Sequence, residues 1–440
     1  MNRRIVLAAL ALAGLPLAAA LAAALVPKDT TVRLSLGFAG DEPDADCDRV
    51  AISGNGRYVA FSSSATDLVE GDGNAARDVF VCDTKTLLVE RVSVDSGGAD
   101  ADSFSNFPSL SASGRYVTFE SSATDLVAGD GNGTDDVFVR DRDSDATSRV
   151  SVASDGTEGD DESEDPAISG NGRYVAFESD ATNLVAGDVG GFGDVFLHDR
   201  KTGATTRVSV ATGGIEADDD CRDPAISANG RWIAFRTQAT NLAPADLNGS
   251  DDVFLHDRKT GTTIIASASP AGIPQGDCAG QVAVSATGRY VMFNSEASGL
   301  VADDTNGTDV MDTFVFDRVK GTTERVTLGP DDVQAEDPVA GGIFTYTVAL
   351  SGSGRYAAFP SAATNLVEGG TTGPQHVYVR DIKKRVTLLM SLGPADVQGD
   401  GDSPEAALSK SGRTVAFNSS ATNLVVGDVA DLEDVFVRRW

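Results

Sequence analysis

Residues 56–61 read Gly-Arg-Tyr-Val-Ala-Phe, and close copies of this stretch return six more times along the 440-residue chain. The further copies begin at Gly114, Gly172, Gly230, Gly288, Gly354 and Gly412. Successive copies start 58 residues apart, except that 66 residues separate the fifth from the sixth. A fixed period of this length is typical of supersecondary units that bury their faces against their neighbours, so the chain is a repeat protein.

The third copy shows what one repeat contains. Four short runs rich in Val, Ile, Phe, Tyr and Thr are separated by clusters of Gly, Asn and Asp, and they lie at 166–169, 173–178, 194–198 and 206–210. Such runs predict β-strands, and no helical apolar period of useful length follows residue 30. Each repeat should be one four-stranded antiparallel blade, so we predict an all-β, seven-bladed β-propeller over residues 27–440.

The two ends of the chain indicate how the ring closes. The last copy stops after its third strand, at residues 434–440, whereas residues 31–36 match residues 205–210 at a shift of three periods. We therefore expect the N-terminal strand to complete the last blade. This closure removes a free sheet edge that would otherwise invite aggregation.

The motifs S-x-x-G-R-Y-V-A-F and D-V-F-V-R-D resemble the repeats of the TolB-type, WD-repeat-like propeller family over residues 31–440. The Pro-Asp-Gly turn usual in that family is replaced by Gly54-Asn-Gly56 or Ala112-Ser-Gly114, the repeats are longer, and the Trp-Asp dipeptide of true WD repeats is missing. The resemblance implies a propeller in an extracytoplasmic setting. It implies no catalytic residues, because the family is mainly a binding scaffold.

The N-terminus resembles a targeting signal. Residues 1–4 include two arginines and precede an apolar run from Ile5 to Val26, with small residues at 20–24. This pattern predicts a signal peptide over residues 1–26, so we expect export to the periplasm, the cell surface or the medium. The apolar run is also long enough to span a bilayer, so an uncleaved N-terminal anchor is the alternative.

The chain is strongly acidic, with a formal net charge of −31. Nucleic acid is excluded as a partner class, because phosphate binding needs a basic surface. Beyond the N-terminal segment no membrane contact is expected, and the charge favours a soluble monomer. The sequence leaves the partner open as a protein or a small molecule.

Much of the acidic charge should gather on one face of the disc. The loops between blades and the loops between second and third strands emerge together, and they include the acid-rich segments 41–48, 155–165 and 216–223. We call this side the acidic face. At the opposite edge, the Arg of each G-R-Y and the Asp that ends the third strand should pair in six blades, as Arg173 with Asp199, and we interpret these pairs as structural.

The loops between second and third strands repeat the pattern D-x-N-G-x-x-D. Two carboxylates and an amide oxygen on a tight turn are ligands that suit Ca²⁺, which is therefore the candidate cofactor. The alternative is a hairpin in which Asn-Gly forms the turn and Asp bonds loop amides, since residues 370–376 close the same connection without an acid. The candidate metal ligands are Asp130, Asn132, Asp136, Asp246, Asn248, Asp252, Asp304, Asn306 and Asp312.

No catalytic residue is predicted. The three histidines are too dispersed for a Ser-His-Asp site, and the innermost strands should offer the channel small, apolar or hydroxyl side chains with nothing titratable. Catalysis would need acids at the channel mouth as a general acid and base. Those acids would be Asp165, Asp223, Asp337 and Glu405. We therefore expect an exported binding module, with a carboxylate-dependent hydrolase or lyase and a purely structural envelope protein as alternatives.

Two further features stay open at this point. The longer spacing places extra residues around 341–346, where Phe344 and Tyr346 could anchor a partner or belong to a loop that plugs the channel. Cys221 and Cys278 lie almost one period apart, so a disulfide between them is an open alternative to two free thiols. The other two cysteines should be free.

Overall fold

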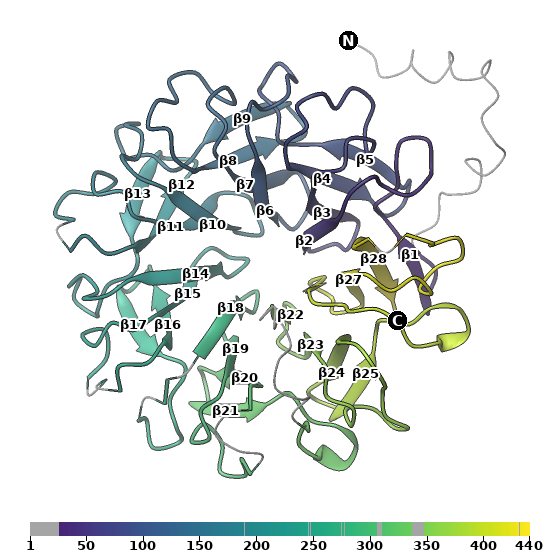
Figure 1. The fold of residues 1–440 in the computed structure, drawn as a ribbon. Helices are drawn as coiled ribbons and strands as arrows, with labels where there is room; N and C mark the ends of the chain where they lie inside the picture. The colour runs from purple at the N-terminus through teal and green to yellow at the C-terminus, as the bar shows by residue number, and fades with distance from the viewer. Residues whose placement is uncertain are drawn as a thin grey trace.

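The structure, a computed structural model, describes residues 26–440 except 189, 245, 247, 274, 277, 306–309, 337–346 and 431. Seven four-stranded antiparallel sheets surround a central axis as blades (Figure 1), which confirms the predicted fold class. The short 3-10 turns η4 and η5 span Pro330–Asp332 and Pro394–Asp396. No helix in the described part of the chain is long and apolar enough to cross a membrane.

In blades one to six the strands follow chain order from the axis outward, and in blade seven the N-terminal strand β1 takes the outermost place. Blade one consists of β2 (Cys47–Ile52), β3 (Tyr58–Ser63), β4 (Asp78–Asp83) and β5 (Leu88–Arg91). Blade two consists of β6 (Ser105–Leu110), β7 (Tyr116–Ser121), β8 (Asp136–Asp141) and β9 (Ala146–Arg149). Blade three consists of β10 (Ser163–Ile168), β11 (Tyr174–Ser179), β12 (Asp194–Asp199) and β13 (Ala204–Arg207).

The remaining blades repeat this order. Blade four consists of β14 (Cys221–Ile226), β15 (Trp232–Thr237), β16 (Asp252–Asp257) and β17 (Thr262–Ile265). Blade five consists of β18 (Cys278–Val284), β19 (Tyr290–Ser295), β20 (Asp312–Asp317) and β21 (Thr322–Arg325). Blade six consists of β22 (Ala349–Leu350), β23 (Tyr356–Ser361), β24 (His376–Asp381) and β25 (Val386–Leu389). Blade seven consists of β26 (Ala406–Leu408), β27 (Thr414–Ser419), β28 (Asp434–Arg439) and β1 (Thr30–Arg33).

Two strand boundaries in blade three differ from the prediction by three residues, and the others agree within two residues. The innermost strand starts at Ser163 instead of residue 166, because a bulge between Glu164 and Ala167 lets the earlier residues pair with β11. The outermost strand ends at Arg207, before the predicted 206–210 run is complete. The chain turns away there, and Val210 forms an isolated bridge with Glu216 inside the interblade loop.

The N-terminal strand closes the ring as predicted. β1 pairs with β28 in antiparallel register, with Val32 opposite Val437 (Figure 1). Beyond the strand, Ser35 donates a hydrogen bond of 2.5 Å to Asp434 Oδ1. The two ends of the chain therefore share one sheet, and β28 has a partner on both sides.

The geometry explains the repeated G-R-Y motif. Gly172 has a φ of 71°, and a Cβ there would lie 2.0 Å from the Tyr116 ring of the preceding blade, so only glycine fits. Arg173 Nη2 lies 2.6 Å from Asp199 Oδ2. The equivalent Arg–Asp distances are 2.5 to 2.7 Å in all six blades with both residues, so the predicted pairs are confirmed.

Packing between blades forms the core. Stacked aromatic pairs such as Phe177 and Phe196, with centroids 6.0 Å apart, lie on the second and third strands. The buried clusters join residues of adjacent blades. All four cysteines are buried and free, so Cys221 and Cys278 are not bridged and no disulfide contributes to the stability of the ring.

The turns between first and second strands meet around the axis. The amide of Ala112 donates a hydrogen bond of 2.9 Å to Gly170 O, and the amide of Gly170 donates one of 3.1 Å to Ala228 O. Equivalent bonds link the other blades and return to Gly54, so seven hydrogen bonds form a closed ring that we call the axial girdle. A Cβ on Gly170 would lie 3.0 Å from the Ala228 side chain, so this end of the axis is narrow.

Candidate functional site

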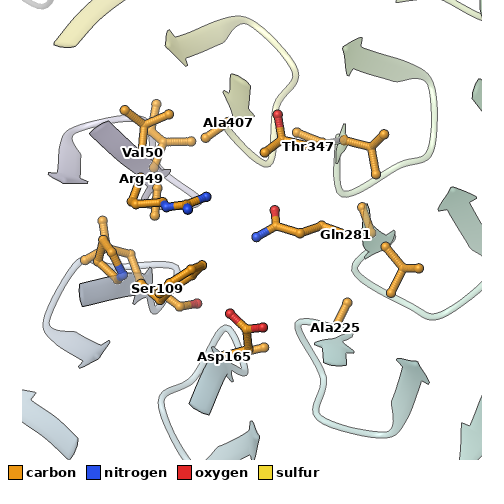
Figure 2. A pocket seen from close by; sticks show the side chains of 18 of the residues that line it. Arg49, Val50, Ser109, Asp165, Ala225, Gln281, Thr347 and Ala407 are labelled. Atoms are coloured by element: carbon orange, nitrogen blue, oxygen red, sulfur yellow. The ribbon is translucent and has the colours of Figure 1, made fainter. Parts of the chain in front are cut away.

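A cavity of 310 Å³ lies on the axis, lined by the innermost strand of each blade (Figure 2). The bulge in four of these strands puts one residue into the left-handed conformation, with φ of 55°, 48°, 48° and 55° at Arg49, Phe107, Asp165 and Asp223. Figure 2 shows Arg49, Asp165 and Gln281 pointing into the cavity from different sides. The bulges interrupt the regular alternation of the strands. They therefore direct polar side chains such as Arg49 and Asp165 into the cavity.

The residue four positions before the Ser of S-x-x-G-R lines the cavity in every blade, and six of its seven occupants are polar. We call its occupants the axial ring: Arg49, Phe107, Asp165, Asp223, Gln281, Thr347 and Glu405. The G-R-Y motif is nearly the same in every blade, whereas six residue types occupy these seven positions. A site that binds one asymmetric ligand on a repeated scaffold needs different residues in different blades. The axial ring is therefore the candidate functional site.

The axial ring corrects the prediction that the channel contains nothing titratable. Three of the four acids proposed for the channel mouth, Asp165, Asp223 and Glu405, line the cavity together, and Arg49 lies among them. The fourth, Asp337, lies outside the described residues, as do Asn306, Phe344 and Tyr346. Aligning the seven repeats and searching for the column that differs would have identified the ring from sequence.

The cationic side of the ring is built around Arg49. Its Nη1 lies 3.4 Å from Glu405 Oε1, and its guanidinium lies 4.4 Å from the centroid of the Phe107 ring. Glu405 also accepts a hydrogen bond of 3.2 Å from the amide of Val50. Burial raises the pKa of Glu405, while Arg49 and this amide act in the opposite direction.

The anionic side of the ring contains two neighbouring aspartates. Asp223 Oδ2 lies 2.7 Å from Arg236 Nη2, and Arg236 also reaches Asp251 at 2.6 Å. Asp165 forms no ion pair in the described part of the chain. Burial, followed by the charges of Asp223 and Glu164, raises the pKa of Asp165 to about 7. This carboxyl group therefore titrates near neutral pH.

The buried Glu120 and the half-buried Glu178 lie behind the anionic side of the ring. Glu120 Oε2 accepts a hydrogen bond of 3.1 Å from the amide of Asp165, and Glu178 Oε2 accepts one of 3.0 Å from the amide of Asp223. Burial raises the pKa of each glutamate to about 8. At pH 7 both side chains are therefore mostly protonated.

In five blades, two of which carry a predicted metal loop, an arginine at the end of the fourth strand lies among the acids of the loop between the second and third strands. In blade two, Arg149 Nη1 lies 2.8 Å from Asp136 Oδ2 and 3.4 Å from Asp130 Oδ1, and it also contacts Glu158. Asn132 Nδ2 donates a hydrogen bond of 3.0 Å to Gly159 O and so supports the turn. The same place in the other four blades is taken by Arg33, Arg91, Arg207 and Arg325. In blade five, Arg325 lies 3.0 Å from Asp304 and 3.4 Å from Asp312.

Blade four keeps the acids without the arginine. Ile265 pairs with Phe254 at the position where Arg207 pairs with Phe196 in blade three. Asn248 Nδ2 donates a hydrogen bond of 2.8 Å to Asp252 Oδ2. Burial and the charge of Asp252 raise the pKa of Asp246 to about 6. This loop therefore differs from the five in which a guanidinium balances the carboxylates.

Other acids on the acidic face also have structural partners. Both carboxylate oxygens of Asp102 accept hydrogen bonds from Thr124, one of 2.7 Å from its amide and one of 2.7 Å from its hydroxyl. The same arrangement recurs between Asp44 and Thr66, Asp160 and Thr182, Asp218 and Thr240, and Asp400 and Thr422. Much of the acidity seen in the sequence therefore stabilises loops.

No protein-family model matches this chain, and no curated protein matches its sequence. Among solved structures it is similar to oligogalacturonate lyase from Vibrio parahaemolyticus, with a TM-score of 0.53, 11% identity and 92% of each chain covered. An oligogalacturonate lyase in complex with manganese gives a TM-score of 0.52 and 11% identity over 93% of this chain and 92% of that one. TolB from Acinetobacter baumannii is a further structural neighbour, with a TM-score of 0.41 and 12% identity over 89% of this chain and 80% of that one. The two lyases show a shared propeller fold. The TolB-type character of the repeats remains a resemblance.

Proposed function

We propose that this protein is an exported binding module that holds a small ligand in the axial cavity. The observation behind this proposal is the axial ring, whose residues differ from blade to blade on a scaffold that otherwise repeats. The cavity of 310 Å³ is at the small end of ligand pockets, which range from about 300 to 1,000 Å³. Its mixture of apolar walls and a few converging polar groups is also typical of such pockets.

This proposal places the working site in the cavity instead of the loops of the acidic face. The loop acids are largely engaged with arginines and threonines, so fewer of them remain for a partner. A small molecule therefore fits the geometry better than a protein that would cover the whole face. We propose a monomer, because the closed ring needs no second chain to complete the cavity.

Mass spectrometry under native conditions tests the ligand proposal. We expect purified protein to retain a small molecule, and Gln281→Trp to lose it, because Gln281 is exposed in the cavity and a tryptophan would fill that space. Thr157→Trp, on an exposed interblade loop, should keep it. Retention that is equal in all three proteins would contradict an axial site.

Export is the second part of the proposal, and it is supported by the sequence of residues 1–26. N-terminal sequencing of extracytoplasmic material should find a start between about residues 21 and 27. Protein that keeps Met1 and stays in the cytosol would rule out this location.

We further propose that, among the loops with paired acids, the loop of blade four binds Ca²⁺ through Asp246, Asn248 and Asp252. The supporting observation is Ile265, which leaves these carboxylates without the arginine that the other such loops contain. A cation bound there would balance two buried charges, and Ca²⁺ accepts the carboxylate, amide and carbonyl oxygens of such a loop.

A carboxylate-dependent hydrolase or lyase is the alternative use of the same cavity. Asp165 has a pKa of about 7, which suits general acid–base catalysis near neutral pH. The two most similar structures reported above are oligogalacturonate lyases. We prefer a binding module because an acidic cavity repels a polyuronate, and release of unsaturated products from oligogalacturonate would reverse that preference.

A further inference from the structure

The axial ring contains one carboxyl group without a cation beside it. Glu405 lies 3.4 Å from Arg49, and Asp223 lies 2.7 Å from Arg236. Asp165 is the third acid of the ring, and no arginine, lysine or histidine of the described residues forms an ion pair with it. Figure 2 shows that its carboxyl group points into the cavity. The ring therefore presents one unbalanced negative group to whatever occupies the cavity.

The surroundings of Asp165 make this imbalance costly. Burial removes water from the carboxylate, and Asp223 and Glu164 add negative charge, while Arg49 compensates only in part. A cation placed in the cavity would offset both the lost hydration and the like-charge repulsion.

The shape and lining of the cavity indicate what kind of cation fits. A volume of 310 Å³ far exceeds that of a bare metal ion. Among the described residues, the groups of three acids spaced to hold a metal lie in the loops of blades two and three and not in the axial ring. Ala167, Ile168 and Ala225 give the wall an apolar surface, which suits a hydrocarbon body.

We propose that the ligand of the axial cavity is a small organic ammonium ion, with its charged nitrogen against Asp165 and its hydrocarbon part against the alanine and isoleucine wall. This inference rests on the proposed function and specifies the chemical class of the ligand. Gln281 and Thr347 add neutral hydrogen-bonding groups on other sides of the ring. They would contact further polar atoms of the ligand without opposing its charge.

The variant Asp165→Asn tests the charge with little change in shape. Position 165 has a φ of 48°, and asparagine tolerates this left-handed conformation as well as aspartate does. The side chain keeps its size and loses its negative charge. Asp161→Asn is the matched control, because it removes the same charge four residues away at an exposed position outside the cavity.

Three probes of equal length separate charge from size: n-pentylammonium, pentan-1-ol and pentanoate. Ligand-observed NMR titration of the full-length mature protein should show that pentylammonium binds at least about tenfold more tightly than either of the others. Asp165→Asn should lower its affinity at least about tenfold, and Asp161→Asn should leave it unchanged. Since Asp165 must be ionised, affinity should also fall by about tenfold from pH 8 to pH 6.

The outcomes distinguish the ligand class from the site itself. If all three probes bind equally and Gln281→Trp abolishes their binding, the axial site stands and the ammonium proposal is overturned. It is also overturned if pentylammonium binds equally well to Asp165→Asn. If no probe binds the wild-type cavity at millimolar concentration, the ammonium proposal fails, while the native mass spectrum still decides the proposed function independently.

Discussion

Glu120 Oε2, in blade two, accepts a hydrogen bond of 3.1 Å from the backbone amide of Asp165 in blade three. A buried carboxyl group therefore joins two blades directly behind the cavity. Glu178 repeats this arrangement toward blade four. Because burial raises the pKa of both glutamates to about 8, the protonation of these two groups links the stability of the ring to pH.

The first prediction concerns Glu120→Gln. A glutamate in the unfolded chain ionises near pKa 4.3, well below its folded value, so the unfolded state loses its proton first as pH rises. The stability that protonated Glu120 provides is complete below about pH 4 and is lost as pH rises toward 8. Glutamine keeps the acceptor oxygen without ionising, so the variant should gain on the order of 1–3 kcal/mol of unfolding free energy at pH 8 and little at pH 4.

Urea unfolding at both pH values measures this effect. Glu70→Gln, at an exposed position of blade one, is the control and should change neither value. If Glu120→Gln and wild type show the same pH dependence, then Glu120 is ionised in the folded protein.

The second prediction concerns ring closure. Deletion of residues 26–36 removes β1 and the bond between Ser35 and Asp434, so it exposes the edge of β28. We expect a lower melting temperature and aggregation, because an unpaired edge strand can pair with another chain. A chain that begins at residue 26 retains β1 and is the control. Equal melting temperatures and monomeric behaviour in both proteins would argue against a stabilising role for β1.

The third prediction concerns calcium in blade four. At a hundredfold excess over its dissociation constant, Ca²⁺ should stabilise the wild type by about 2.7 kcal/mol. Ile265→Arg introduces the guanidinium that the corresponding position has in five other blades, so it should raise the melting temperature without calcium and remove the response to calcium. Thermal unfolding with Ca²⁺ and with EDTA compares the two proteins. A wild type that melts at the same temperature in both solutions has no such site.

The fourth prediction separates backbone strain from steric contact at two turn glycines. Gly172 and Gly133 both have a φ of 71°, but a Cβ at Gly172 meets the Tyr116 ring at 2.0 Å, while a Cβ at Gly133 meets nothing within 4 Å. Gly133→Ala should lose about 1–2 kcal/mol of stability from strain alone. Gly172→Ala should lose about 1–3 kcal/mol more, because the ring must move. Equal losses in denaturant unfolding would show that contact between blades adds nothing.

The fold was predictable because every blade repeats the same local chemistry. The period of G-R-Y set the number of blades, the strand runs set the sheets, and the match between residues 31–36 and 205–210 located the closing strand. The strand ends were less accurate, because the bulge after Glu164 and the turn after Arg207 depend on neighbouring strands.

The candidate site was harder to predict for two physical reasons. The loop acids resemble a calcium site when they are considered alone, but their counter-charge is an arginine at the end of the fourth strand, such as Arg149. Blade six lacks both groups, with His376 and Leu389 at these positions, whereas blade four keeps the acids and has Ile265 in place of the arginine. Three acids of the axial ring, Asp165, Asp223 and Glu405, were named from the sequence, but their convergence with Arg49 in one cavity was not predicted, because a period-two pattern does not reveal the bulges that reorient side chains.

The closing strand also determines the order in which the molecule can be completed. β1 is the first strand to be synthesised and β28 the last, and Arg33 reaches Asp434 across 401 residues of chain. The final sheet therefore cannot form on the ribosome until β28 has emerged, whereas blades one to six can assemble from neighbouring segments. Blade seven is therefore the last of the seven blades that can be completed, and closure of the ring waits for a contact between strands at opposite ends of the propeller sequence.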